Sequence, residues 1–292
     1  GSGFVSGLDG QPWLLTNAHV LAGNPRPRFT KLNGAELPLG PASLGVGHDI
    51  CRISAPGGTA MLEAMTDTDQ VARIGDAVAV LGNAEGAGVI KPFEGRIVGL
   101  GPNLVEVDAP FVPGNSGSPI IHVPTGKVLG IATYLVTRKI DPKGDGSVQT
   151  SVRRFGYRLD SVKAWEPVDW ARFYAQAAQV ERIQATGEDF ARLFADAREK
   201  SISSANYTNS QIKRALETFE RVAKSGRRMS AADLGNARRA LLGDLRIAAM
   251  TDINAFDART AYDYFRREVA DEKKFRDDVY TGFTRAMESV SP

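Results

Sequence analysis

The chain has 292 residues, with a hydrophobic fraction of 42%, a charged fraction of 24% and a formal net charge of +2 at pH 7. This composition predicts a globular protein, and the length is enough for about two domains. The small net charge argues against nucleic-acid binding, which needs a concentrated basic face. No apolar run approaches the ~20 residues that span a bilayer, so we expect no membrane partner.

The single cysteine, Cys51, excludes an internal disulfide. That fits a reducing compartment, but it also fits bacterial envelope proteins that use no disulfides. The compartment therefore stays open, with a slight preference for the bacterial cytoplasm over the periplasm. The chain starts at "GSGFVSG" without an initiator methionine or a signal-peptide pattern, so we expect that any targeting segment has been removed or lies outside this sequence.

The first part of the chain, residues 4–159, has a β pattern. Short runs rich in Val, Ile and Leu, such as "AVAVLGN" and "KVLGIATYLV", alternate with clusters of Gly, Pro, Asn and Asp. Their spacing is typical of a β-barrel or sandwich. Residues 138–149, "RKIDPKGDGSVQ", are predicted to form an exposed loop between two late strands.

After residue 160 the apolar period changes to three and four, as in Ile212, Ala215, Leu216 and Phe219. This period predicts amphipathic helices. The stretches "TNSQ" (208–211) and "SAAD" (230–233) are typical helix starts with capping side chains. We predict a first domain over residues 1–160 and a helical bundle over residues 161–292. The expected helices span about 161–183, 188–200, 208–224, 230–250 and 253–290.

The stretch "FVPGNSGSPI", residues 111–120, places Ser116 in a turn rich in Gly and Pro. A serine hydroxyl is a poor nucleophile unless a base takes its proton and donors stabilise the resulting oxyanion. Gly114 can adopt backbone angles closed to other residues, so its N–H and that of Ser116 can converge as an oxyanion hole. His19 in "LLTNAHV" and Asp49 in "GHDI" are the candidate base and orienting carboxylate.

The segments "GSGFV", "LLTNAHV", "HDI" and "GNSGSP", in this order, resemble the trypsin-like serine proteases, closest to the bacterial Do-like, HtrA-type branch. The resemblance covers about residues 1–160. It implies two six-stranded antiparallel β-barrels that divide near residues 66–72, with the active site between them. It also implies that His19 is the general base, that Asp49 orients its imidazole, and that Ser116 is the nucleophile.

Two departures from this family have consequences for the chain. In the digestive branch an aspartate precedes the nucleophile and pairs with a new N-terminal amine, but Asn115 stands there. An amide cannot form that ion pair, so we expect activation by loop ordering or by a partner. Family members also carry a strand before the segment that matches "GSGFV". Either upstream residues were lost, or the first barrel is completed in another way.

In this family the specificity pocket is lined by residues before the nucleophile and by the strand that matches "GIATYLV". No acidic residue matches the pocket base that selects Lys or Arg, and burying an unpaired ammonium is costly. The resemblance therefore implies cleavage after a small or medium apolar residue. The expected pocket residues are Pro110, Phe111, Val112, Thr133, Tyr134 and Leu135.

The remaining candidates have simpler interpretations. We expect His48 to be a turn residue, His122 a strand residue and Cys51 a buried packing residue with no basic partner beyond Arg52. Zinc needs three or four clustered ligands, and the sequence contains no such cluster. We therefore expect no metal and no cofactor.

HtrA-type enzymes usually continue into a PDZ domain, whereas this chain continues into helices. These helices have three open interpretations: a structural extension, a regulatory module that binds a protein partner, or a surface for self-association. The sequence as a whole predicts a serine endopeptidase that acts on proteins or peptides through an acyl-enzyme. The alternative is a latent or non-catalytic protein-binding module on a protease fold, activated only by a partner.

Overall fold

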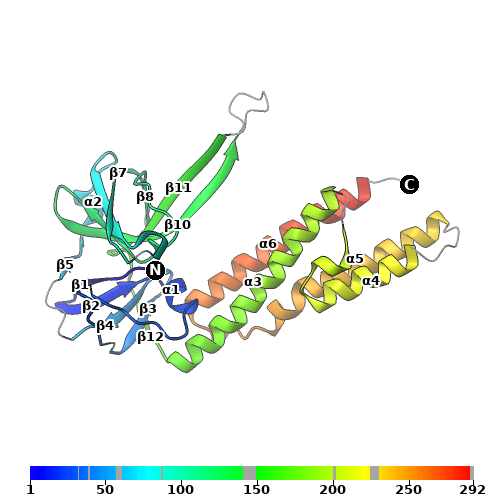
Figure 1. The fold of residues 1–292 in the computed structure, drawn as a ribbon, viewed down its shortest axis with the longest axis horizontal. Helices are drawn as coiled ribbons and strands as arrows, with labels where there is room; N and C mark the ends of the chain where they lie inside the picture. The colour runs from blue at the N-terminus through cyan, green and yellow to red at the C-terminus, as the bar shows by residue number, and fades with distance from the viewer. Residues whose placement is uncertain are drawn as a thin grey trace. The chain divides into compact units, whose positions relative to one another are not determined.

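The computed structural model describes residues 1–31, 33–38, 40–56, 61–86, 88–140, 149–199, 202–223 and 230–289. The chain divides into two compact units, Gly1–Tyr174 and Ala175–Pro292. All described strands belong to the first unit, and most of the helical residues belong to the second (Figure 1). A functional boundary at residue 160 stays a prediction.

The first half of the β unit forms a six-stranded sheet with the order β12-β3-β4-β2-β1-β5. The pairs are antiparallel except for β1 and β5, which are parallel. The β1–β2 hairpin turns at Asp9 and Gly10, which both have positive φ, as a two-residue type I′ turn requires. The strands are β1 (Phe4–Leu8), β2 (Gln11–Thr16), β3 (Ala42–Gly45), β4 (Cys51–Ser54), β5 (Leu62–Glu63) and β12 (Trp165–Pro167).

The second half of the β unit forms a closed barrel with the order β10-β11-β8-β7-β6-β9. Alternate residues of β6 point into its core, which includes Val78, Val80, Ile97 and Ile120. The strands are β6 (Ala77–Gly82), β7 (Lys91–Leu100), β8 (Leu104–Val107), β9 (Pro119–His122), β10 (Lys127–Ile140) and β11 (Gln149–Arg158). The described residues of this unit also form three short helical elements: α1 (Ala18–Ala22), α2 (Thr68–Val71) and η1 (Ala84–Gly86).

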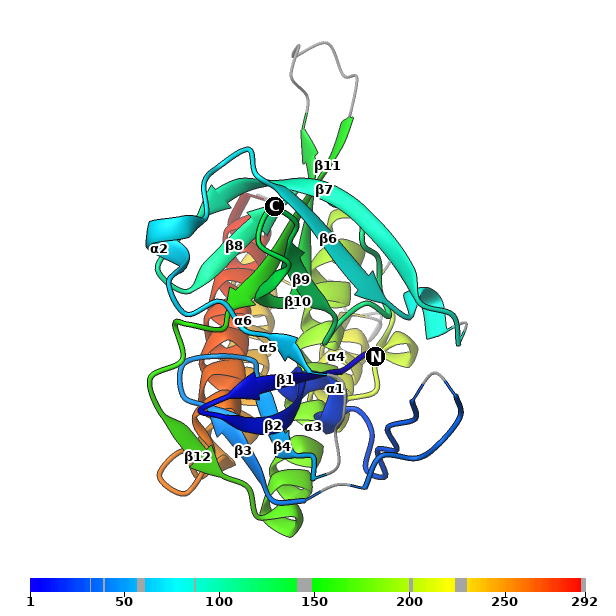
Figure 2. The same ribbon diagram turned by 90° about the vertical axis from the view of Figure 1, so that its left-hand side faces the viewer.

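The hairpin of β10 and β11 is longer than predicted. Its strands stay paired out to Ile140 and Gln149, and Figures 1 and 2 show them extending beyond the rest of the barrel. The predicted loop over residues 138–149 is therefore wrong at both ends, because Arg138, Lys139 and Ile140 continue β10 and Gln149 already belongs to β11. Its centre, residues 141–148, lies outside the described residues.

The trypsin-like fold class is confirmed, with a difference in the first barrel. That half is a six-stranded sheet rather than a closed barrel, and its edge strand β12 comes from a segment that follows the second barrel (Figure 2). In β12, Trp165 pairs with Gly45 and Pro167 with Ser43. The expected helix from residue 161 is wrong here, because proline lacks an N–H and disfavours helix in the residue before it.

The second unit is helical, as predicted. Its apolar core includes Phe190, Leu216, Leu245 and Phe283. Among the described residues, no helix is both long and apolar enough to cross a membrane. The elements are α3 (Trp170–Glu199), which begins in the first unit, η2 (Ser204–Asn206), α4 (Ser210–Ala223), α5 (Ala231–Ala255) and α6 (Asp263–Ser289).

The break expected between the first two helices is absent, and α3 runs through Gly187. A helical glycine costs about 1 kcal/mol relative to alanine, so the sequence indicates a helix end there. In the fold, a Cβ on Gly187 would overlap the carboxylate of Glu272 in α6. The glycine thus leaves room for the Glu272 carboxylate and does not end the helix.

The two predicted helix starts are confirmed. Ser230 forms a capping box with Asp233 at the start of α5. At the start of α4, Asn209 Oδ1 accepts hydrogen bonds from the backbone N–H groups of Gln211 and Ile212. Local capping chemistry therefore determines where these helices begin.

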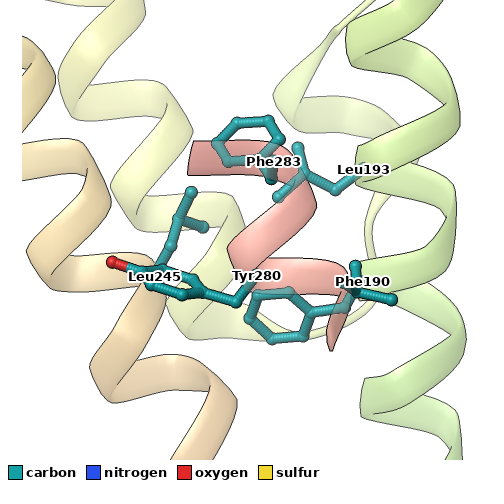
Figure 3. A pocket seen from close by; sticks show the side chains of 6 residues that line it. Phe190, Leu193, Leu245, Tyr280 and Phe283 are labelled. Atoms are coloured by element: carbon teal, nitrogen blue, oxygen red, sulfur yellow. The ribbon is translucent and has the colours of Figure 1, made fainter. Parts of the chain in front are cut away.

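The helical core contains a small hydrophobic cavity that has no space for a water molecule. Figure 3 shows that its walls come from α3, α5 and α6. We interpret it as a packing defect rather than a ligand site. It is lined by Phe190, Leu193, Leu245, Val279, Tyr280 and Phe283.

Candidate active site

His19 and Asp49 are in direct contact. His19 lies on α1, immediately after β2, and Asp49 lies just before β4, which pairs with β2. The Nδ1 atom of His19 is 2.6 Å from Oδ2 of Asp49, and the backbone N–H of His19 donates to Oδ1 at 3.0 Å. Both carboxylate oxygens therefore orient one histidine. An imidazole that carries its proton on Nδ1 can accept another at Nε2.

The two side chains differ in exposure. The side chain of Asp49 is 12% exposed, whereas that of His19 is 38% exposed. A shielded carboxylate thus holds a ring that faces solvent. This arrangement lets the histidine exchange protons with a molecule that approaches from outside.

Ser116 lies in a turn that is held together by hydrogen bonds of Asn115. Asn115 is fully buried; its N–H donates to the Val112 carbonyl at 3.1 Å, and its Oδ1 accepts from the Val112 N–H at 3.0 Å. Gly114 and Gly117, on either side, have φ values of 98° and 88°. Only glycine adopts such angles readily, so the sequence "GNSG" specifies this turn.

The Ser116 turn is attached to β10 of the barrel. The Ser116 hydroxyl donates to the Thr133 carbonyl at 3.4 Å, and the Gly117 N–H donates to the Ala132 carbonyl at 3.0 Å. The pairing of β10 with β11 shifts register between Ala132 and Tyr134. This bulge directs the Thr133 carbonyl toward Ser116.

Asn17 joins the two halves of the site. Its Nδ2 donates to the Asp49 carbonyl at 2.7 Å and to Thr133 Oγ1 at 3.1 Å. The segment with His19 and Asp49 is thereby linked to the strand that holds the Ser116 turn. We did not predict this role for Asn17, although its place two residues before His19 in "TNAHV" was a signal.

This geometry can be compared with known proteins. Residues 1–131, a segment that includes His19, Asp49 and Ser116, match the trypsin-like peptidase domain. The first unit thus contains a trypsin-like peptidase domain over residues 1–131. The chain is therefore a serine peptidase.

Similar solved structures include two forms of the Rv3671c protease from M. tuberculosis. The active form is 23% identical with a TM-score of 0.43, and the match covers 58% of this chain and 76% of that one. The inactive form is 24% identical with a TM-score of 0.40, and the match covers 56% and 79%. No curated protein sequence matches the chain.

The expected pocket residues of the peptidase domain lie in different environments. Phe111 is 3% exposed and belongs to the barrel core. The Thr133 hydroxyl is buried and donates to the Ile131 carbonyl at 2.9 Å. Tyr134 is exposed, and its ring stacks on Phe155. The role of these residues in specificity stays a prediction. The other three, at least partly exposed, are Pro110, Val112 and Leu135.

The other two histidines of the peptidase domain have structural partners. His48 is buried in a turn, with Nδ1 2.8 Å from the Val46 carbonyl and Nε2 2.8 Å from Ser161 Oγ. His122, the last residue of β9, contacts Asp76 at 3.0 Å. Their predicted positions in a turn and a strand are confirmed.

The packing role of Cys51 is also confirmed. Its side chain is fully buried in β4. Burial, and then the nearby charge of Asp49, raise the pKa of its thiol far above the usual range. A thiol in this state is neither a nucleophile nor a metal ligand. The described residues contain no group of three or more His, Cys, Asp or Glu side chains that would hold a metal ion.

Proposed function

We propose that the chain is a serine endopeptidase in which Ser116 attacks a peptide carbonyl. His19 takes the hydroxyl proton of Ser116 and then gives it to the leaving amine, which produces an acyl-enzyme. Water, deprotonated by the same imidazole, releases the acyl group and restores Ser116. The double contact between Asp49 and His19 carries this proposal, because it orients the ring and stabilises its charged form.

The hydrogen bonds of the turn support an oxyanion hole at Gly114 and Ser116. The backbone N–H groups of Val112, Asn115, Gly117 and Ser118 all donate to partners in the protein. Within the described part of the chain, the N–H groups of Gly114 and Ser116 donate to none. Two donors left without partners beside a serine hydroxyl fit the needs of a developing oxyanion.

We propose cleavage after small or medium apolar residues. No acidic side chain is among the six expected pocket residues, so a bound Lys or Arg would leave its charge unpaired. A peptide-library cleavage profile should be dominated by Ala, Val or Leu before the scissile bond. A profile dominated by Arg or Lys would contradict this specificity.

We also propose that activity does not depend on an ion pair with a new N-terminus. Asn115, at the position of the activating aspartate, is uncharged and uses its side-chain oxygen within the turn. Control by a protein partner, or by self-association, would then fall to the helical unit. Labelling rates that rise with protein concentration, beyond simple proportionality, would indicate self-association.

Covalent labelling with a fluorophosphonate, read by intact mass, tests the reaction directly. We expect stoichiometric labelling of the unmodified chain and none of Ser116→Ala. Ser118→Ala is the matched control, because this neighbouring buried serine lies in the same turn and its hydroxyl has no partner in the described structure. Absence of labelling in the unmodified chain would instead support a latent or non-catalytic module, which the family match does not favour.

A further inference from the structure

Ser2, in the "GSGFV" segment, contacts the nucleophile turn through two groups. Its backbone N–H donates to the Ser116 carbonyl at 2.8 Å. Its hydroxyl donates to the Gly114 carbonyl at 3.3 Å. These two carbonyls flank the peptide group that carries the Ser116 N–H, one of the two proposed oxyanion donors.

Ser2 is itself held by two other segments. Thr16 Oγ1 donates to the Ser2 carbonyl at 2.7 Å, and the Asn83 N–H donates to Ser2 Oγ at 3.0 Å. Thr16 is fully buried at the end of β2, three residues before His19, and Asn83 directly follows β6. Ser2 therefore joins the strand that leads to His19 to the turn that bears Ser116.

The turn needs an external restraint because of its glycines. Gly114 has no Cβ to limit its backbone angles, so the peptide groups beside it can rotate at little cost. A rotation that turned the Gly114 N–H, which belongs to one of these peptide groups, away from the substrate would remove an oxyanion donor. Hydrogen bonds to the carbonyls of Gly114 and Ser116 oppose such a rotation.

Gly117 shows how closely Ser2 and the turn fit together. A Cβ on Gly117 would overlap the Ser2 carbonyl oxygen and would lie 2.6 Å from Thr16 Oγ1. The backbone of Ser2 thus occupies the space that a side chain at residue 117 would need. This contact gives a steric reason for glycine there, besides its positive φ.

We propose that Ser2 is a positioning residue that holds the Gly114 and Ser116 peptide groups in the orientation of a working oxyanion hole. This inference rests on the proposed serine endopeptidase function. Ser2 does not touch the reacting atoms and acts through the turn.

The test compares Ser2→Ala with the matched control Ser6→Ala. Ser6 lies on the same segment, is fully buried, and donates from its hydroxyl to the Leu62 carbonyl at 2.8 Å, away from the turn. We expect Ser2→Ala to lower kcat and the fluorophosphonate labelling rate by about tenfold, less than the 10²–10³ for removing a donor itself. KM should change little, Ser6→Ala should keep the normal rates, and Ser2→Thr, which keeps the hydroxyl, should recover most of the activity.

Two outcomes separate this inference from the function on which it rests. If the unmodified chain and Ser2→Ala are labelled at equal rates, the positioning role is wrong and the endopeptidase function stands. If the unmodified chain is not labelled, the endopeptidase proposal fails, and hydrogen exchange of the peptide spanning residues 110–118 decides the positioning role. Faster exchange in Ser2→Ala than in Ser6→Ala supports it, and equal exchange overturns it.

Discussion

Arg276 in the helical unit and His19 in the peptidase domain both contact carboxylates, but they differ in how much of the side chain stays open to solvent. Arg276 of α6 is fully buried, and its guanidinium makes five hydrogen bonds: to Asp252, Glu272 and two backbone carbonyls. His19 has Asp49 on one side, while 38% of its side chain stays exposed. A fully satisfied charge stabilises packing but has no capacity left for a substrate. The His19 imidazole is instead oriented by Asp49 and partly open to solvent, as a proton-transfer group needs to be, so the comparison separates structural from reactive polar groups.

The largest expected effect is a loss of kcat, and it comes from changing Asp49, the partner of His19. Asp49→Asn should lower kcat by roughly 10⁴, because an amide favours the wrong imidazole tautomer and does not stabilise the imidazolium. Steady-state hydrolysis of a peptide substrate measures it. Asp76→Asn is the matched control, since it alters the other Asp–His contact of the domain, with His122. Equal losses of kcat in the two variants would contradict the view that the Asp49–His19 contact is catalytic and the Asp76–His122 contact structural.

The second prediction concerns the buried Arg276 and the stability of the helical unit. Arg276→Met should destabilise the helical unit by about 3–5 kcal/mol, because Asp252 and Glu272 would lose their buried counter-charge. Helix content followed by circular dichroism during urea unfolding measures this loss. The control Arg246→Met breaks an ion pair with Asp277 in which both side chains are at least 38% exposed, and should cost at most about 1 kcal/mol. Similar losses would mean that burial of Arg276 is unimportant.

A smaller effect is expected at a structural ion pair inside the peptidase domain. Arg158, 4% exposed, contacts Asp160 at 2.9 Å. Burial raises the pKa of Asp160, but hydrogen bonds from Arg158 and Thr68 outweigh it and hold that pKa below its usual value. Stability from this carboxylate is therefore present above its unfolded pKa, about 3.9, and is lost as the pH falls through the lower folded pKa.

The matching variant is Asp160→Asn. At pH 7 it should be about 1–2 kcal/mol less stable than the unmodified chain, between the values for exposed and buried pairs. The difference should begin to shrink below about pH 4, where the unfolded carboxylate becomes protonated, and should be lost below the lower folded pKa, where the native carboxylate is neutral as well. Urea unfolding at pH 7 and pH 3 measures both values, with Asp69→Asn, whose side chain is 81% exposed, as the control. A difference that does not vary with pH would contradict this assignment.

Much of the candidate site was predictable because its motifs are local. The order of "LLTNAHV", "HDI" and "GNSGSP" predicts His19, Asp49 and Ser116 as site residues, and the structure brings the first two into contact. Capping at Asn209 and Ser230 was predictable for the same reason, since a cap depends on residues within one turn.

The contacts that span long stretches of sequence were not predictable. Nothing near Ser2 indicates that it contacts Ser116, and nothing near Trp165 indicates that it pairs with Gly45. Gly187 looks like a helix end in sequence, because its close neighbour Glu272 is far along the chain. Periodicity reports which face of an element is apolar, but not which distant element covers it.

The position of β12 has a consequence for synthesis on the ribosome. The strand that covers the edge of β3 is made only after all six strands of the barrel. Until then β3 presents an unpaired edge, a feature that promotes wrong association in nascent chains. The half that carries His19 can therefore complete its strand pairing only after the half that carries Ser116 has been translated. The folding of the two halves is thus completed at the same stage of synthesis.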